Sequence, residues 1–134
     1  CNRVNCQCLI RGTKNVICVS IHVNAAGNGT SWTNATGWSV YTSKGQTEAD
    51  ILADCLANAA KKYLTEQKIR GDWSDGDIDF EAGFYILKHT LCPAVLTENF
   101  FMDNHKDLQY LQSATGRRAI VDLHVEGIIE YIER

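Results

Sequence analysis

The sequence NVICVSIHVNA at residues 15–25 is nearly all apolar and β-branched, without the alternation of a half-buried strand. A continuous run of this kind predicts a strand that is buried on both faces. The sequence PAVLT at residues 93–97 is a second fully apolar run and predicts a second such strand. Because fully buried strands are typical of parallel sheets, these two runs decide the expected fold class.

Helical patterns flank and separate the two strands. Residues 2–11 are expected to form a helix that ends at Gly12, and Thr47 with Asp50 is expected to open a helix that runs to about residue 66. A short strand is expected at 37–42, loops at 26–36, 70–83 and 99–105, and two last helices at about 106–112 and 115–133. The predicted fold is α/β, a mostly parallel sheet with helices on both faces.

Composition excludes several classes of protein. The chain has 134 residues, which fits one domain, and its 45% hydrophobic and 22% charged residues are ordinary for a globular protein. The net charge of −3 argues against nucleic-acid binding. No apolar run approaches the roughly 20 residues of a membrane span, and the N-terminus does not resemble a signal peptide.

Each predicted strand carries a polar side chain toward its end. His22 lies between Ile21 and Val23, and Glu98 directly follows Thr97. Because the carboxyl ends of parallel strands meet at one edge of a sheet, the two side chains are expected to lie together there. A polar ring or a carboxylate in apolar surroundings needs a partner or a function. A metal-binding His beside a proton-transferring Glu is usual in metal-assisted hydrolysis, which is the chemistry that this pair predicts.

Other candidate ligands are interpreted as structural. His89 is expected to be exposed, His105 lies in the loop after Glu98, and His124 is expected to pack in the core on the last helix. Five acidic residues at 72–81 hint at calcium, but they lack the EF-hand pattern and favour a solvated acidic loop. They are Asp72, Asp75, Asp77, Asp79 and Glu81.

The six cysteines favour neither a disulfide framework nor a zinc site. Cys1, Cys6 and Cys8 lack both the CxxC-type spacing and the fourth ligand of a structural zinc site. Cys18, Cys55 and Cys92 lie inside apolar runs, where free cysteine packs as a small hydrophobe.

The sequences VSIHVNA at 19–25, GWSVYTS at 37–43 and ILKHTLCPAVLTENFFMDN at 86–104 together resemble a known family. They are similar to the zinc-dependent N-acetylmuramoyl-L-alanine amidases of the type-3 amidase family. The middle helix, the last helix and Arg70-Gly71 also fit, so the resemblance covers essentially the whole chain. Members of this family cleave the amide bond between the lactyl group of N-acetylmuramic acid and the L-alanine of the peptidoglycan stem peptide.

The resemblance implies roles for three residues. His22 matches the last of the family's three zinc ligands, which are His, Glu and His, and Glu98 matches its catalytic glutamate. Asn24 follows the ligand by two residues and is expected at the rim of the site, where it would orient the ligand loop or the substrate. The resemblance thus implies Zn²⁺ as the cofactor, with a water in its open position, and peptidoglycan as the partner.

The family's first zinc-binding His and its Glu ligand precede the point that corresponds to Cys1. The resemblance therefore implies that residues 1–134 are an N-terminally incomplete catalytic domain that lacks the family's N-terminal strand and helix. Two of the three zinc ligands are expected from this missing N-terminal segment, which is either absent or carried on a separate piece. The uneven charge agrees with this expectation, because residues 1–47 hold four basic and no acidic residues.

Two alternative functions stay open at this point. A non-catalytic peptidoglycan-binding module would keep the amidase fold, although a pure binder has no need of a buried carboxylate at Glu98. A zinc carboxypeptidase with another substrate would share the metal chemistry. For an amidase, the expected place of action is the bacterial cell wall, outside the cytoplasm, after secretion or delivery by a phage.

Overall fold

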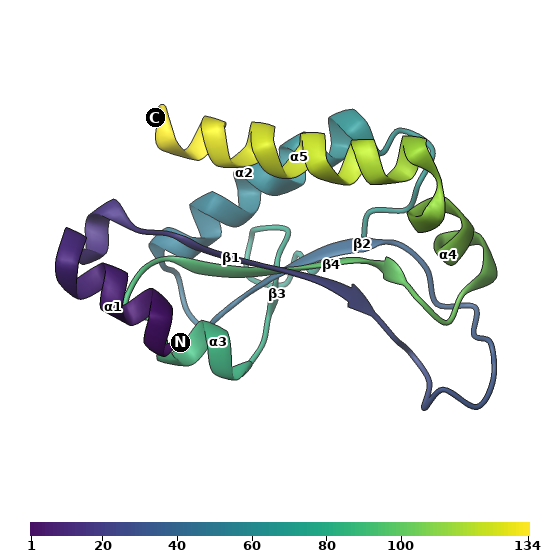
Figure 1. The fold of residues 1–134 in the computed structure, drawn as a ribbon, viewed down its shortest axis with the longest axis horizontal. Helices are drawn as coiled ribbons and strands as arrows, with labels where there is room; N and C mark the ends of the chain where they lie inside the picture. Colours follow the sequence, from purple (N-terminus) through teal and green to yellow (C-terminus); the bar gives the residue numbers. More distant parts are fainter.

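The structure is a computed structural model that describes residues 1–134. Four strands form one sheet, and five α-helices and a short 3₁₀-helix connect and cover them (Figure 1). The strands are β1 (Cys18–Asn24), β2 (Trp38–Thr42), β3 (Phe80–Glu81) and β4 (Ala94–Phe101). The helices are α1 (Asn2–Arg11), η1 (Thr13–Asn15), α2 (Glu48–Tyr63), α3 (Tyr85–His89), α4 (His105–Gln112) and α5 (Ala114–Ile132).

The sheet has the strand order β1-β4-β2-β3. The pairs β1–β4 and β2–β3 are parallel, and β4 runs antiparallel to β2. Helices α2 and α5 cover one face of the sheet, and α1 and α3 lie on the other (Figure 1). The predicted fold class, a mostly parallel α/β sheet with helices on both faces, is confirmed.

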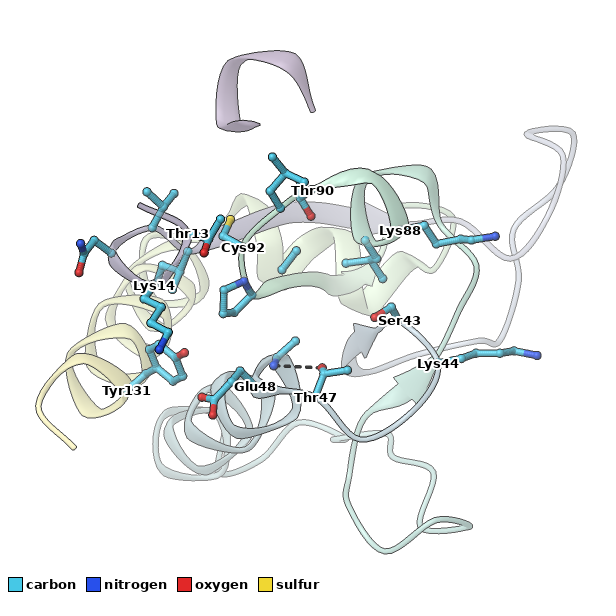
Figure 2. A pocket seen from close by; sticks show the side chains of 18 of the residues that line it. Thr13, Lys14, Ser43, Lys44, Thr47, Glu48, Lys88, Thr90, Cys92 and Tyr131 are labelled. Atoms are coloured by element: carbon cyan, nitrogen blue, oxygen red, sulfur yellow. Dashed lines mark hydrogen bonds between the residues drawn. The ribbon is translucent and has the colours of Figure 1, made fainter. Parts of the chain in front are cut away.

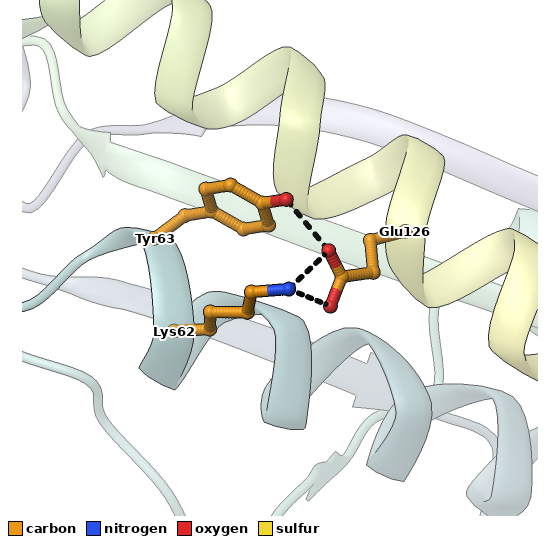
Figure 3. Close-up of polar contacts among 3 residues, drawn as sticks. All are labelled: Lys62, Tyr63 and Glu126. Atoms are coloured by element: carbon orange, nitrogen blue, oxygen red, sulfur yellow. Dashed lines mark hydrogen bonds and ion pairs between the residues drawn. The ribbon is translucent and has the colours of Figure 1, made fainter.

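The main core lies between the sheet and the helices α2 and α5. The capping box predicted for α2 is present, because the Thr47 side chain caps the first turn and the Asp50 carboxylate accepts from the Thr47 main-chain N–H. On the outer side of the two helices, Glu126 of α5 accepts from Lys62 Nζ at 2.7 and 2.8 Å and from Tyr63 Oη at 2.6 Å (Figure 3). This polar contact joins the end of α2 to the middle of α5.

The prediction that residues 15–25 form a strand is confirmed for Cys18–Asn24, but the prediction that it is buried on both faces is wrong. β1 pairs only with β4 and lies at the edge of the sheet. As a result, Ile21 is 58% and Val23 40% exposed. Apolar composition alone does not reveal how many neighbours a strand has, and this is the reason for the error.

The second predicted strand is longer than expected. β4 continues to Phe101, so Glu98 lies within the strand, and residues 99–101 are not part of a loop. Beyond Glu98 the pairing contains a β-bulge, because β1 advances from His22 to Asn24 while β4 advances from Glu98 to Phe101. Phe100 takes up the additional residue with a φ of 67°, a backbone region that bulky side chains rarely adopt.

Smaller differences concern element ends. α2 ends at Tyr63, three residues before the expected end, and the predicted polar loop at 70–83 contains the short strand β3. Residues 85–89, which follow this loop, form the helix α3. The helix at 2–11 with Gly12 at its C-terminal end, the strand at 37–42 and the two last helices are confirmed to within one residue or two. None of the helices is both long enough and apolar enough to cross a membrane.

Gly127 allows α5 to approach α2 closely. A Cβ at this position would lie 2.8 Å from Leu56 Cα and 3.1 Å from Leu56 N, which are main-chain atoms that no rotamer change can move away. We expect Gly127→Ala to lower the free energy of unfolding by about 1–2 kcal/mol, because overpacking outweighs the higher helix propensity of alanine. Urea unfolding followed by circular dichroism measures this change.

Gly83→Ala is the matched control, since its Cβ would meet only Lys88 Cδ, at 3.9 Å. A Gly127→Ala variant as stable as the wild type would show that the two helices are not held at this distance.

Candidate active site

His22, Glu98 and Ser39 form one row across three neighbouring strands. In the register of the sheet, Glu98 of β4 is opposite His22 of β1 on one side and opposite Ser39 of β2 on the other. Side chains of register partners stand on the same face of a sheet. The neighbouring Thr97 points to His124 of α5, so the row lies on the face opposite α2 and α5. The structure thus brings together the two residues that the sequence singled out.

Glu98 combines a half-buried carboxylate with unused hydrogen-bonding capacity. Its Oε2 atom is buried and has no hydrogen-bond partner, and the neighbouring Ser39 Oγ is buried and unpartnered as well. Burial raises the pKa of Glu98, and the nearby His22 ring partly opposes this shift. A carboxylate of raised pKa that is free to accept a proton is suited to acid–base chemistry.

His22 is exposed next to this carboxylate. Its Nε2 atom lies 2.8 Å from Ser20 Oγ, two residues earlier on the same strand. Its main-chain carbonyl is held from the other side, because it accepts from Asn99 Nδ2 at 2.9 Å. The backbone that carries the imidazole is therefore fixed while the ring remains accessible.

Asn24 ends β1, and the loop after it is held by a carboxylate. Asn24 Oδ1 accepts from the Ala25 main-chain N–H at 2.8 Å, so this side chain caps the end of the strand. Asp103 accepts from the main-chain N–H groups of Ala26, at 3.0 Å, and Gly27, at 2.7 Å. These bonds, that of Gly27 above all, lower the pKa of Asp103. The loop that follows the candidate ligand strand is thereby fastened to the end of β4.

A chain of buried hydrogen bonds lies behind the site. Trp38 Nε1 donates to Asn99 Oδ1 at 2.9 Å, and Asn99 Nδ2 donates to Thr97 Oγ1 at 3.1 Å. Thr97 Oγ1 lies 2.8 Å from His124 Nε2, and His124 Nδ1 lies 2.7 Å from the Ile120 carbonyl. Because a carbonyl only accepts, Nδ1 is the donor, and Nε2 of the neutral ring accepts from Thr97.

Sequence reasoning missed the roles of Trp38, Asn99 and Thr97. The available signal was the pair of polar residues that flank Glu98 in an otherwise apolar run.

Asp107 is a second buried group that sequence reasoning missed. Only 6% exposed, it accepts from Thr36 Oγ1 at 2.5 Å and from the main-chain N–H groups of Gly37, at 3.1 Å, and Phe101, at 3.0 Å. One carboxylate thus joins the first turn of α4, the end of β4 and the start of β2. The loops around the site begin and end at these points.

The other histidines do not join the His22–Glu98 row. His124 is 4% exposed and packs in the core, as predicted. His89 is exposed, as predicted, and stacks on Tyr85 with 4.2 Å between ring centroids. His105 stacks on Trp32 at 3.6 Å at the start of α4. No three His, Cys, Asp or Glu side chains are grouped as a metal site within residues 1–134, and all six cysteines are free.

A large pocket lies away from this row. It opens where β4 begins, beside Cys92, and the capped start of α2 at Thr47 and the residue Tyr131 of α5 line it as well (Figure 2). Neither His22 nor Glu98 lines it. Its size alone does not make it the site of chemistry, since it offers no paired titratable groups like those at the centre of β4.

The fold and this row define an α/β domain that presents an imidazole and an unpartnered carboxylate on adjacent parallel strands. The chain belongs to the N-acetylmuramoyl-L-alanine amidase family, whose model matches residues 3–130. It is 33% identical over 116 residues to the endolysin of Bacillus phage SPP1. The matched stretch covers 85% of this chain and 39% of the endolysin.

Solved structures agree with the family. N-acetylmuramoyl-L-alanine amidase AmiC2 of Nostoc punctiforme matches with a TM-score of 0.78 and 25% identity, over 99% of this chain and 65% of that one. The catalytic domain of the CD27L endolysin, which targets Clostridia difficile, matches with a TM-score of 0.64 and 26% identity, over 96% of this chain and 59% of that one. The chain thus spans about two-fifths of the phage endolysin and somewhat under two-thirds of each of these solved chains.

Burial, opposed by the bond to the Ile120 carbonyl, lowers the pKa of His124 below its ordinary value. The unfolded chain therefore binds the proton more readily, and stability is lost as pH falls below about 6.5, until the folded-state pKa is reached. His124→Gln removes this contribution. We expect the difference in unfolding free energy between wild type and variant to shrink between pH 7.5 and pH 5.5, as measured by urea unfolding.

His89→Gln, a change on the exposed face of α3, is the control and should leave the pH profile unchanged. Parallel profiles for the wild type and His124→Gln would contradict the assignment of a neutral, buried ring.

Proposed function

We propose that this chain is part of the catalytic domain of a zinc-dependent hydrolase that cleaves the amide bond between N-acetylmuramic acid and L-alanine in peptidoglycan. One observation carries the proposal: the unpartnered, half-buried carboxylate of Glu98 lies in register with the exposed imidazole of His22. Membership of the amidase family and the likeness to a phage endolysin support the substrate class.

The residues present fit one part of a zinc site. His22 is an accessible imidazole beside a carboxylate with a free oxygen, which is the donor chemistry of a catalytic zinc centre. Such a centre ordinarily takes three protein ligands, and within residues 1–134 we assign only His22. We expect the other two ligands from residues that precede Cys1 in a longer protein, in keeping with the share of its relatives that this chain spans.

Glu98 is the group that moves protons in this proposal. Zinc, when bound, supplies Lewis-acid activation of the scissile carbonyl and of a water molecule. Glu98 takes the proton of the attacking water through its free Oε2 and passes it to the nitrogen of the leaving amine. The raised pKa of Glu98 makes its carboxylate a better proton acceptor, so the carboxyl can hold the proton until it passes to the amine.

Asn24 is proposed to support this site from its rim. Its bond to the Ala25 N–H keeps the end of β1 in place, and the loop that follows is fastened by Asp103. A fixed loop next to the metal ligand can orient the ligand or the glycan–peptide substrate. The proposed place of action is the bacterial cell wall, where the substrate lies, reached by secretion or by release from a phage-infected cell.

Substitutions of Glu98 and of His22 are expected to have different effects on activity and zinc content. Both are made in the protein that carries residues 1–134 with its native flanking sequence. Glu98→Gln should lower the release of dye from labelled cell walls by about 10²–10⁴-fold and keep the bound zinc, because it removes only the proton transfer. His22→Ala should lose both activity and zinc. Dye release and metal content of the purified variants measure the two effects.

Glu66→Gln and His89→Ala, both at exposed positions, serve as matched controls and should retain both readouts. Equal loss of zinc in Glu98→Gln and His22→Ala would overturn the division of roles. Binding to cell walls without release of dye, with or without a chelator, would instead indicate a peptidoglycan-binding module. Release of a terminal amino acid from the stem peptide would indicate a carboxypeptidase.

A further inference from the structure

The acidic segment at 72–81 is only in part the solvated loop that the sequence predicts, since Asp75 and Glu81 are exposed. Asp79 is only 2% exposed, and its neighbour Ile78 is buried too. The Oδ2 atom of Asp79 accepts from Thr42 Oγ1 of β2 at 2.5 Å, while its Oδ1 atom has no hydrogen-bond partner. The prediction is therefore wrong for Asp79, because a strand residue 37 positions away in sequence holds its carboxylate inside the protein.

A second carboxylate faces the first. Asp77, two residues before Asp79, lies close enough for its carboxylate to raise the pKa of Asp79, and both carboxylates are acceptors when ionised. Asp77 Oδ2 accepts from Gln46 Nε2 at 3.1 Å, and Asp77 Oδ1 is buried without a partner. Each of the two carboxylates thus has a buried oxygen without a partner, and a proton or a cation between them would stabilise this arrangement.

Helix α2 adds negative charge to this place. Asp50, which is 7% exposed, and Asp54 both have raised pKa values. Burial is the larger cause for each, and the nearby charge of Asp77 adds to it. The three ion pairs of the structure are Lys62–Glu126, Arg118–Asp122 and Arg134–Glu48, and none involves these carboxylates. Lys61, near Asp54, offsets part of this charge.

We propose that Asp77 and Asp79 bind a calcium ion, with Asp50 and Asp54 as the surrounding charge. Asp77 lines a hollow together with Gln46, Asp50, Asp54 and Asp75, and this hollow gives the ion a way in on the side of Asp77. Calcium prefers carboxylate and other oxygen ligands, about six to eight in number, in irregular arrangements. Two carboxylates converge here, so waters and main-chain oxygens of the loop complete the coordination.

The bound ion would fasten one part of the molecule to another. Asp77 and Asp79 belong to the segment that leads into β3, Thr42 ends β2, and Asp50 lies in the first turn of α2. Without a cation, burial and the neighbouring Asp77 and Asp50 carboxylates raise the pKa of Asp79 to about 7, against the bond from Thr42, so the carboxyl is only partly ionised at neutral pH. This site is separate from the His22–Glu98 row, and its existence does not depend on the proposed amidase activity.

Thermal unfolding with added CaCl₂ tests the proposal on the protein that carries residues 1–134, after dialysis into metal-free buffer at pH 7.5. We expect half-saturation at roughly 10⁻⁴–10⁻³ M, the range of extracellular calcium modules. At ten times the Kd, the ratio of folded to unfolded protein rises about elevenfold, a Tm increase of roughly 5 °C. Asp79→Asn and Asp77→Asn should abolish this shift.

Asp72→Asn is the matched control, because it makes the same charge change in the same loop and asparagine can keep the bond that Asp72 Oδ1 accepts from the Ser74 N–H. It should respond to calcium as the wild type does. In metal-free buffer, Asp79→Asn should be at least as stable as the wild type, because it removes an unpartnered buried charge. If Asp79→Asn does not fold, Asp77→Asn provides the same test, because Asp77 is only half-buried.

Three outcomes would overturn the proposal. Absence of any shift up to 20 mM CaCl₂ would mean that the two carboxylates share a proton instead. Equal Tm shifts in all variants would mean that calcium binds non-specifically or at the His22–Glu98 row, which is intact in every variant. A shift with MgCl₂ but not with CaCl₂ would assign the carboxylates to magnesium.

Discussion

The arrangement of the sheet depends on one buried side chain, the amide of Asn99. Its carbonyl oxygen accepts from Trp38 of β2, and its nitrogen donates to the carbonyl of His22 on β1 and to Thr97 on its own strand. Through Thr97 the chain of bonds continues to His124 of α5. Because the partners of this amide come from three strands, it fixes the outer strand β1 at the level of Glu98. A polar network costs little when its members are satisfied, and this one positions the backbone of the candidate metal ligand.

Much of the fold was accessible from local patterns in the sequence. The capping box at Thr47, the glycine after α1 and the helical spacing of α2 and α5 are local signals, and the corresponding helices form almost as predicted. The juxtaposition of His22 and Glu98 followed from the rule that parallel strands end at one edge. The continuation of β4 past Glu98 could not be predicted in this way. It depends on Trp38, which is 61 residues away and supplies the partner of an otherwise turn-favouring Asn99.

Three carboxylates of this protein, those of Glu98, Asp77 and Asp79, carry buried oxygens without partners, and their neighbours distinguish Glu98 from the two aspartates. Glu98 lies beside an imidazole, so it is paired with a potential metal ligand and is suited to moving a proton. Asp79 lies beside another aspartate, so nothing in the protein balances its charge. The sequence marked both residues, but burial was predictable only for Glu98, which follows an apolar run. The burial of Asp79 comes from Thr42 and the packing of the loop on β2, which composition does not reveal.

The position of β1 at the edge of the sheet has two consequences. Its free edge leaves the His22 ring accessible, and the same edge offers unpaired main-chain groups together with the exposed side chains of Ile21 and Val23. No proline or lysine interrupts Cys18–Asn24, and these are residues with which proteins commonly protect such edges. An edge of this kind is a template for any other extended strand. The property that opens the candidate site to a ligand therefore also makes residues 1–134, taken alone, liable to associate strand to strand.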